Sequence, residues 1–267
     1  TPLILEAGGM VAANLESYRH VRLFSPWRYN MDKASSALLQ AHGWAAPELD
    51  SLPTAGEIID RYLTPLAALP LLAKNLHLNS PVTHITRAGF DKVKTVGREA
   101  AAFVLRVTQA GVEKEYRAQA VIDASGTWNQ PNPLGANGLP ALGERAAAEH
   151  IAYGMPDVLG RQRSRYAGKR VLVVGAWHSA AGSLIALAQL AQEDPSTRLV
   201  WAIRGNNLAK IFGGGEADGL PARGALGQRL RALKENGQLE LHENFRVAEI
   251  HHTGAKLWVL GESVNGV

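Results

Sequence analysis

The sequence contains no cysteine among its 267 residues. This absence argues against a disulfide scaffold, a thiol nucleophile and a cysteine-based metal site. The nine histidines do not indicate a metal site either, because none has the H-E-x-x-H spacing of a zinc-binding helix. His251 and His252 are neighbours on an expected strand, so they should point to opposite faces. We therefore predict no metal.

Long hydrophobic runs are also missing. No apolar stretch approaches the roughly 18 residues that a membrane helix needs, so we expect a cytoplasmic chain with no membrane partner. Hydrophobic residues make up 46% of the sequence and charged residues 19%, which predicts a globular protein with one large domain or two of ordinary size. The densest basic cluster, at 161–170, is interpreted as a solvated surface, because no basic stripe interleaved with aromatics favours nucleic acid.

The first part of the chain combines a parallel-strand signal, a helix and a β-rich segment. The run LILE at 3–6 is apolar and closed by an acid, which predicts a buried parallel strand. Thr54 followed three positions later by Glu57 forms a capping box and predicts a helix. Short alternating runs from 76 to about 120 predict a small antiparallel β-meander.

The middle of the chain returns to parallel-strand signals. AVIDASG at 120–126 predicts another buried strand, and QPNPLGANGLP at 130–140 predicts an irregular loop. RVLVVGAWHSAAGSL at 170–184 then has the outline of a strand, a tight turn and a helix start, and TRLVWAIRG at 197–205 that of a second buried strand. Together these signals predict two α/β units joined near 150–168.

The last part of the chain predicts one more helix and the closing strands. The helix lies in LPARGALGQRLRALKENG, with Leu226, Leu230 and Leu233 on one side and Gly237 as its stop. The runs LELH, RVAEIHH and KLWVL predict strands.

The turn after the strand that starts at Arg170 carries most of a phosphate-binding fingerprint. Gly175 suits the tight turn, Ala180 the close packing of helix on strand, and Ser179 adds a hydroxyl where the helix N-terminus favours a phosphate. Trp177 stands where the second glycine is expected. A structural turn without ligand stays open as an alternative. A nucleophile elbow on Ser179 is disfavoured, because that motif needs a small residue where Trp177 stands.

Two further residues end strands at positions that can read a ribose. Arg204 follows the next expected strand, 24 positions beyond Ala180. An acid near this position selects NAD, whereas an arginine suits the 2′-phosphate of NADP. Glu6 ends its strand as the ribose-binding acid of a first Rossmann unit does, although a solvated strand end is the simpler interpretation. If Glu6 has that role, the glycine loop of its unit lies before Thr1, and the sequence is an excerpt of a longer protein.

Several stretches together resemble the flavin-containing monooxygenase-like FAD/NAD(P)-dependent oxidoreductases. The matching text is LILEAGG, HVRLFSPWRYNMD, LPTAGEIIDRYLTPLA, VIDASGTWNQPNPLG, RVLVVGAWHSAAGSL with WAIRG, and LPARGALGQRLRAL, in family order. The resemblance implies an α/β fold with two Rossmann-like dinucleotide-binding units of the three-layer FAD/NAD(P)-binding type and a small antiparallel β-meander. It places an FAD-binding domain at 1–150, lacking its first strand and glycine loop, with the meander at about 76–120. An NAD(P)-binding domain follows at 165–267.

The resemblance also implies site residues for two cofactors, FAD and NADP(H). For FAD they are Glu6, Ser25, Pro26, Trp27, Val82, Ala124, Ser125 and Gly126; for NADP they are Gly175, Ala176, Trp177, His178, Ser179, Ala180 and Arg204. In such enzymes NADPH reduces the flavin, and the reduced flavin with oxygen oxygenates a nitrogen, a sulfur or a ketone. The implied function is a flavin-dependent oxidoreductase acting on a small organic molecule. The alternative is a non-catalytic nucleotide-binding or redox-sensing module.

Overall fold

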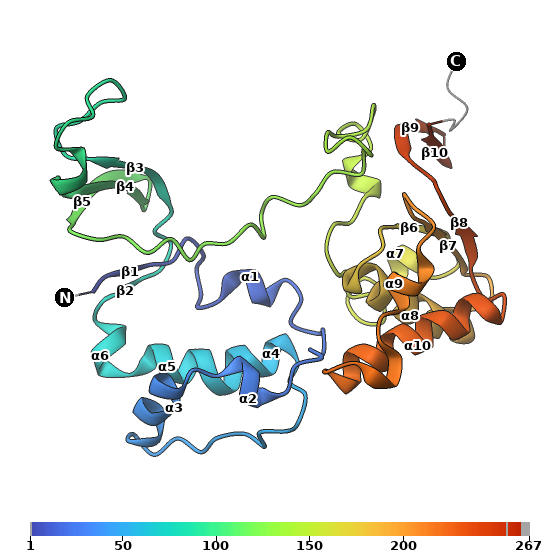
Figure 1. Cartoon of the computed structure of the whole chain (residues 1–267), viewed down its shortest axis with the longest axis horizontal. Helices are drawn as coiled ribbons and strands as arrows, with labels where there is room; N and C mark the ends of the chain where they lie inside the picture. The colour runs from blue at the N-terminus through green and yellow to red at the C-terminus, as the bar shows by residue number, and fades with distance from the viewer. Residues whose placement is uncertain (1, 255, 263–267) are drawn as a thin grey trace. The chain divides into compact units, whose positions relative to one another are not determined.

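The structure is a computed structural model that describes residues 2–254 and 256–262. It divides into two compact units, unit 1 at Thr1–Asn129 and unit 2 at Gln130–Val267 (Figure 1). The division lies earlier than the join predicted near 150–168. The reason is that the segment after Gln130 packs against a strand of unit 2: the Ala136 N–H donates to the Val247 carbonyl at 3.0 Å.

Unit 1 contains a series of short helices. They are α1 (Ala13–Glu16), α2 (Trp27–Asn30), α3 (Lys33–Gln40), α4 (Ala55–Ile58), the π-helical η1 (Ile59–Leu63), α5 (Thr64–Ala68), α6 (Pro70–Ala73) and the 3-10 turn η2 (Arg98–Ala100). A hydrophobic core in unit 1 is built around Trp27, Leu39, Ile58, Tyr62 and Leu69.

The predicted helix after Thr54 is confirmed and runs through α4, η1 and α5. Both bonds of the capping box are present, with the Glu57 N–H donating to Thr54 Oγ1 at 3.1 Å and the Thr54 N–H donating to Glu57 Oε2 at 2.7 Å. The π-helical stretch lies just before Pro65, which has no N–H to donate toward the Arg61 carbonyl one turn earlier. The indole N–H of Trp44 donates to that carbonyl at 2.8 Å.

The sheets of unit 1 comprise a parallel pair and an antiparallel meander. The pair joins β1 (Ile4–Leu5) to β2 (Leu76–His77). The meander has the order β3-β4-β5, with β3 at Val82–Arg87, β4 at Phe103–Gln109 and β5 at Val112–Ala118. It lies inside the predicted range 76–120. Ala110 and Gly111, with φ of 49° and 77°, form the tight turn between β4 and β5.

Two strand predictions in unit 1 need correction. The strand at 3–6 is parallel as expected, but it is not buried, since Ile4 is 41% exposed. Within this stretch, β1 pairs with the two residues of β2 and, in the described chain, with no other strand. The stretch 120–126 is not a strand: it pairs with no strand of the described residues, and Ile122 is 92% exposed. An apolar run adopts strand structure only where a partner satisfies its backbone groups.

Unit 2 is built on a parallel sheet of order β6-β7-β8. Its strands and helices are η3 (Ala148–His150), α7 (Arg163–Tyr166), β6 (Arg170–Val174), α8 (His178–Glu193), β7 (Arg198–Ala202), α9 (Leu208–Phe212), η4 (Gly215–Ala217), α10 (Pro221–Glu235) and β8 (Glu240–His242). A hairpin of β9 (Val247–Thr253) and β10 (Lys256–Gly261) follows. Helix α8 packs against β6 and β7, and α10 packs against α8 (Figure 1). The core between them contains Leu184, Leu187, Trp201 and Leu230.

The predicted helix at 220–237 is confirmed as α10. Leu230 is fully buried, while Leu226 and Leu233 pack against the same core. Gly237, with φ of 65°, follows the helix as its expected stop. Gly227 allows a close approach of backbone to backbone, because a Cβ there would lie 1.9 Å from the Phe212 carbonyl oxygen.

The overall class is a mixed α/β fold. The strand–helix–strand unit predicted from 170–205 is present as β6-α8-β7, and parallel pairing continues into β8. Unit 1 has parallel pairing between β1 and β2 alone among its described residues, so the two predicted Rossmann units are not both resolved. Within the described part of the chain, no helix is both long and apolar enough to cross a membrane.

Candidate functional site

The turn after β6 is anchored on β7 by two hydrogen bonds. The Gly175 N–H donates to the Ala202 carbonyl at 3.0 Å, and the buried indole of Trp201 donates its N–H to the Gly175 carbonyl at 2.7 Å. Gly175 has φ of 132°, a conformation that residues with a Cβ rarely adopt. The sequence prediction that this turn needs Gly175 is therefore met by its backbone geometry.

The N-terminus of α8 faces outward from this turn. Its N-cap is Trp177, which makes no side-chain cap hydrogen bond. Ser179 is exposed, and Ala180 packs closely on the turn, since a Cβ on Gly175 would lie 3.7 Å from the Ala180 Cβ. Ala176 packs partly buried against the core of unit 2. An uncapped N-terminus of a 16-residue helix carries the partial positive charge and the N–H groups that bind phosphate.

Trp177 does not block this N-terminus by packing into it. Its side chain is 70% exposed, and Lys210 Nζ lies 5.9 Å from its ring centroid. The backbone of Trp177 is extended, with φ of −109° and ψ of 179°, so this position has no conformational need for glycine. The backbone of the turn therefore accommodates the indole, which is exposed to solvent.

Arg204 lies just after β7, as predicted, and its side chain is exposed. Its Nη1 donates to the Ala136 carbonyl at 3.2 Å. A guanidinium has five N–H donors, so this bond leaves most of them available for an anion. The arginine predicted to select NADP thus belongs to the same unit as the α8 N-terminus.

The structure adds an acidic neighbour to this region that sequence reasoning left without a role. Asp218 accepts hydrogen bonds from Arg223, with Nη2 to Oδ1 at 2.7 Å, and from the Leu220 N–H at 2.9 Å. The Arg223 hydrogen bond, followed by that of Leu220 and the charges of Arg223 and His178, lowers the pKa of Asp218. This electrostatic effect joins residues 40 positions apart, which no local sequence signal could reveal.

The predicted FAD residues all lie in unit 1. Glu6 Oε1 accepts the Gly8 N–H at 2.7 Å, which fixes the turn after β1. Val82 starts β3 opposite Val107 and is 37% exposed. Ala124, Ser125 and Gly126 are exposed in a segment without helix or strand.

The stretch Ser25–Trp27 is organised by Asn30. Ser25 Oγ donates to Asn30 Oδ1 at 3.1 Å, and Asn30 Nδ2 donates to the carbonyls of Ser25 and Pro26 at 2.8 and 2.9 Å. The indole of Trp27 is 1% exposed in the core of unit 1. Trp27 therefore serves packing in the core of unit 1, and its backbone N–H donates to the Ser51 carbonyl at 3.1 Å.

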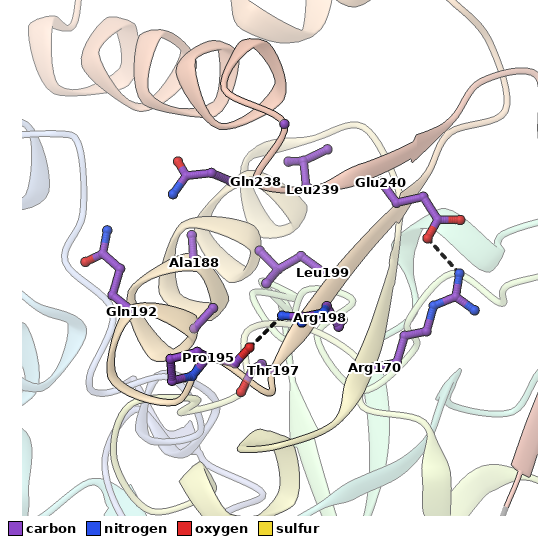
Figure 2. A pocket seen from close by; sticks show the side chains of 12 residues that line it. Arg170, Ala188, Gln192, Pro195, Thr197, Arg198, Leu199, Gln238, Leu239 and Glu240 are labelled. Carbon is purple, nitrogen blue, oxygen red and sulfur yellow. Dashed lines mark hydrogen bonds and ion pairs between the residues drawn. The ribbon is translucent and has the colours of Figure 1, made fainter.

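A cavity of about 530 Å³ lies at the amino ends of the parallel strands, whereas Gly175 follows the carboxyl end of β6. Its lining includes Arg170, Arg198 and Glu240, which are the first residues of β6, β7 and β8. Figure 2 shows Arg170 paired with Glu240 at 2.7 Å and Arg198 turned back onto the Pro195 carbonyl. Ligands of open α/β sheets bind beyond the carboxyl ends of the strands, so this cavity is separate from the candidate site.

The metal-ligating residue types do not gather anywhere in the described chain. Across 2–254 and 256–262, no group of three or more histidines, aspartates or glutamates has the geometry to hold a metal ion.

The fold matches those of FAD/NAD(P)-binding flavoproteins. No protein-family model and no curated protein matches the sequence. Among solved structures, bacillithiol disulfide reductase from Bacillus cereus matches 97% of this chain and 67% of its own, with a TM-score of 0.64 at 16% identity. Ornithine N-hydroxylase from Kutzneria sp. 744, in a structure whose name includes reduced FAD, NADP+ and L-ornithine, matches with a TM-score of 0.55 at 14% identity, over 97% of this chain and 69% of its own.

A flavin-containing monooxygenase from Stenotrophomonas maltophilia also matches, with a TM-score of 0.50 at 18% identity over 97% of this chain and 67% of its own. The resemblance seen in the sequence is therefore confirmed at the level of the fold. This chain spans about two thirds of the length of each of these neighbours.

Proposed function

We propose that this chain is part of an FAD-dependent oxidoreductase that takes electrons from NADPH and acts on a small organic substrate. The observation that carries the proposal is the uncapped N-terminus of α8 behind the Gly175 turn, in the same unit as the exposed Arg204. A helix N-terminus binds a diphosphate, and a guanidinium after the second strand suits a 2′-phosphate. The residues present therefore fit NADP(H).

The fit to FAD rests on unit 1. Glu6 uses Oε1 for the Gly8 N–H, and a carboxylate has about four acceptor positions in all, so Glu6 can still accept a ribose hydroxyl. The exposed segment Ala124–Gly126 and the start of β3 at Val82 offer backbone groups to the cofactor. FAD held by these residues would supply the hydride-accepting chemistry, while the protein would bind, orient and shield the reacting groups.

Oxygenation of the substrate is the reaction we favour over disulfide reduction. The structural neighbours include both kinds of enzyme. We favour oxygenation because the ordered motifs of the sequence, from LILEAGG to LPARGALGQRLRAL, resemble those of the flavin-containing monooxygenases.

The test is to mix the full product of the gene with FAD and then with NADPH under anaerobic conditions. We expect visible flavin absorption bands after removal of unbound FAD and their bleaching on addition of NADPH. Flavin bands that stay unchanged with NADPH would contradict the donor assignment. Binding of NADPH without any flavin would favour the alternative of a nucleotide-binding or redox-sensing module.

A further inference from the structure

Glu144 is a buried carboxylate for which the proposed function provides no role. It is 3% exposed, yet its charge is well satisfied. The Leu134 N–H donates to Oε1 at 3.0 Å, the Ala141 N–H donates to Oε2 at 2.6 Å, and the Tyr153 hydroxyl donates to Oε1. A buried carboxylate with this many donors is costly to disturb, because each donor would lose its partner.

The donors of Glu144 bracket the irregular loop at 134–141. One carboxylate thus holds both ends of this loop together, and the loop is also fixed to β9 by the bond from the Ala136 N–H to the Val247 carbonyl at 3.0 Å. Inside the loop the backbone turns tightly, since a Cβ on Gly135 would lie 2.0 Å from the Leu139 carbonyl oxygen. The position of Ala136 is therefore set by Glu144 on one side and β9 on the other.

Ala136 is the residue whose carbonyl accepts a hydrogen bond from Arg204 Nη1, at 3.2 Å. Arg204 is otherwise exposed, so this carbonyl limits the directions in which its guanidinium can point. A long side chain held in one arrangement before binding loses less conformational freedom when the anion arrives.

We propose that Glu144, together with Tyr153, is a positioning residue that holds Arg204 through the 134–141 loop and so sets the preference for NADP(H) over NAD(H). This inference rests on the proposed function, because it takes Arg204 as the group that meets the 2′-phosphate. A merely structural role of Glu144 would weaken binding of both nucleotides equally. A positioning role weakens NADP+ binding more than NAD+ binding.

The experiment measures the dissociation constants of NADP+ and NAD+ by calorimetry on the full product of the gene and its variants. Tyr153→Phe and Glu144→Gln are each expected to lower the preference for NADP+ by about 3- to 10-fold, the effect of roughly one hydrogen bond. In an Arg204→Ala background the same substitutions should leave the preference unchanged. If Glu144→Gln does not fold, Tyr153→Phe decides, because it keeps the carboxylate.

A matched control is Tyr166→Phe. The Tyr166 hydroxyl is buried in unit 2 and has no hydrogen-bond partner among the residues that the structure describes, so its removal should leave the preference for NADP+ unchanged. If Arg204→Ala lowers the preference but Tyr153→Phe and Glu144→Gln do not, the inference is overturned and the proposed function stands. If Arg204→Ala has no effect, or neither nucleotide binds, both are overturned.

Discussion

At the scale of single residues, the turn between β6 and α8 shows which position of its glycine fingerprint requires glycine for its backbone conformation. Gly175 has φ of 132°, whereas Trp177 has an extended backbone with φ of −109°. Only the first of these conformations excludes side chains. The replacement of the second glycine by tryptophan therefore leaves the backbone of the turn intact, and the indole is placed toward solvent.

Substitution of Trp177 by glycine should have little effect on NADP+ binding. The indole is 70% exposed, and changes at exposed positions usually stay within about 0.5 kcal/mol, or about twofold in a dissociation constant. Calorimetric titration of Trp177→Gly with NADP+ checks this. Binding more than tenfold tighter would show that the indole occupies the nucleotide's place.

Substitution of Gly175 by alanine should destabilise the protein by about 1–3 kcal/mol, because its backbone would be held where a Cβ is strained. The measurement is the free energy of unfolding in denaturant. Gly182→Ala is the matched control: Gly182 lies inside α8, and a Cβ there meets no atom within 4 Å. That substitution should stabilise by about 0.5–1 kcal/mol, and equal effects at the two sites would contradict the account.

The ionisation of Glu144 should make stability depend on pH. Burial raises the pKa of Glu144, but the hydrogen bonds from Tyr153, Leu134 and Ala141 outweigh it and leave the pKa below its ordinary value of 4.5. A lowered pKa in the folded state means that the unfolded state binds more protons as the pH falls below 4.5. The stabilisation is therefore present above that pH and is lost below it.

We expect the free energy of unfolding to fall between pH 5 and pH 3 less steeply in Glu144→Gln than in the unchanged protein, since these values span the ordinary pKa of 4.5. Chemical unfolding at a series of pH values measures both slopes. Identical slopes would show that Glu144 is not the titrating group.

At the scale of elements, the helix from α4 to α5 shows how far local signals reach. The Thr54 and Glu57 capping box could be predicted because both partners lie within four positions. The π-helical stretch η1 could not be predicted, because it depends on Pro65 together with the distant Trp44, whose indole donates to the Arg61 carbonyl. The capping box, which is local in sequence, determines where the helix begins. The Arg61 carbonyl in the π-helical stretch instead accepts its hydrogen bond from a residue 17 positions away.

Substitution of Thr54 by alanine should destabilise unit 1 by about 1 kcal/mol, because the Glu57 N–H loses its acceptor. Thr64→Ala removes the same atoms from an exposed position inside the helix. That control should be neutral or slightly stabilising, since alanine is the better helix former. Thermal unfolding of the two variants compares them directly, and an equal loss in both would argue against the cap.

The same distinction separates the strands that could be predicted from those that could not. The β3-β4-β5 meander follows from alternation within one segment, and its partners are neighbours in sequence. The exposure of Ile4 and the lack of a strand at 120–126 depend instead on which distant segments pair with them. Glu144 was missed for a similar reason: its donors are brought to it by the folding of a loop whose sequence shows only glycine and proline punctuation.

At the scale of the whole molecule, the fold matches those of known flavoproteins although the sequence identity to them is low. Identities of 14–18% accompany coverage of 97% of this chain, because a fold depends on the pattern of apolar positions and turns more than on particular residues. The predicted cofactor residues separate by unit: the FAD set lies before Asn129 and the NADP set after it.

The central claim is tested most directly by calorimetric titration of the full gene product with NADP+ and with NAD+, before and after substitution of Arg204 by alanine. The account predicts that NADP+ binds more tightly than NAD+ and that Arg204→Ala weakens NADP+ binding by about 10- to 100-fold, the effect of a charge-assisted hydrogen bond. NAD+ binding should stay nearly unchanged. Equal affinity for the two nucleotides, or no binding of either, would contradict the assignment of the α8 N-terminus and Arg204 as an NADP site.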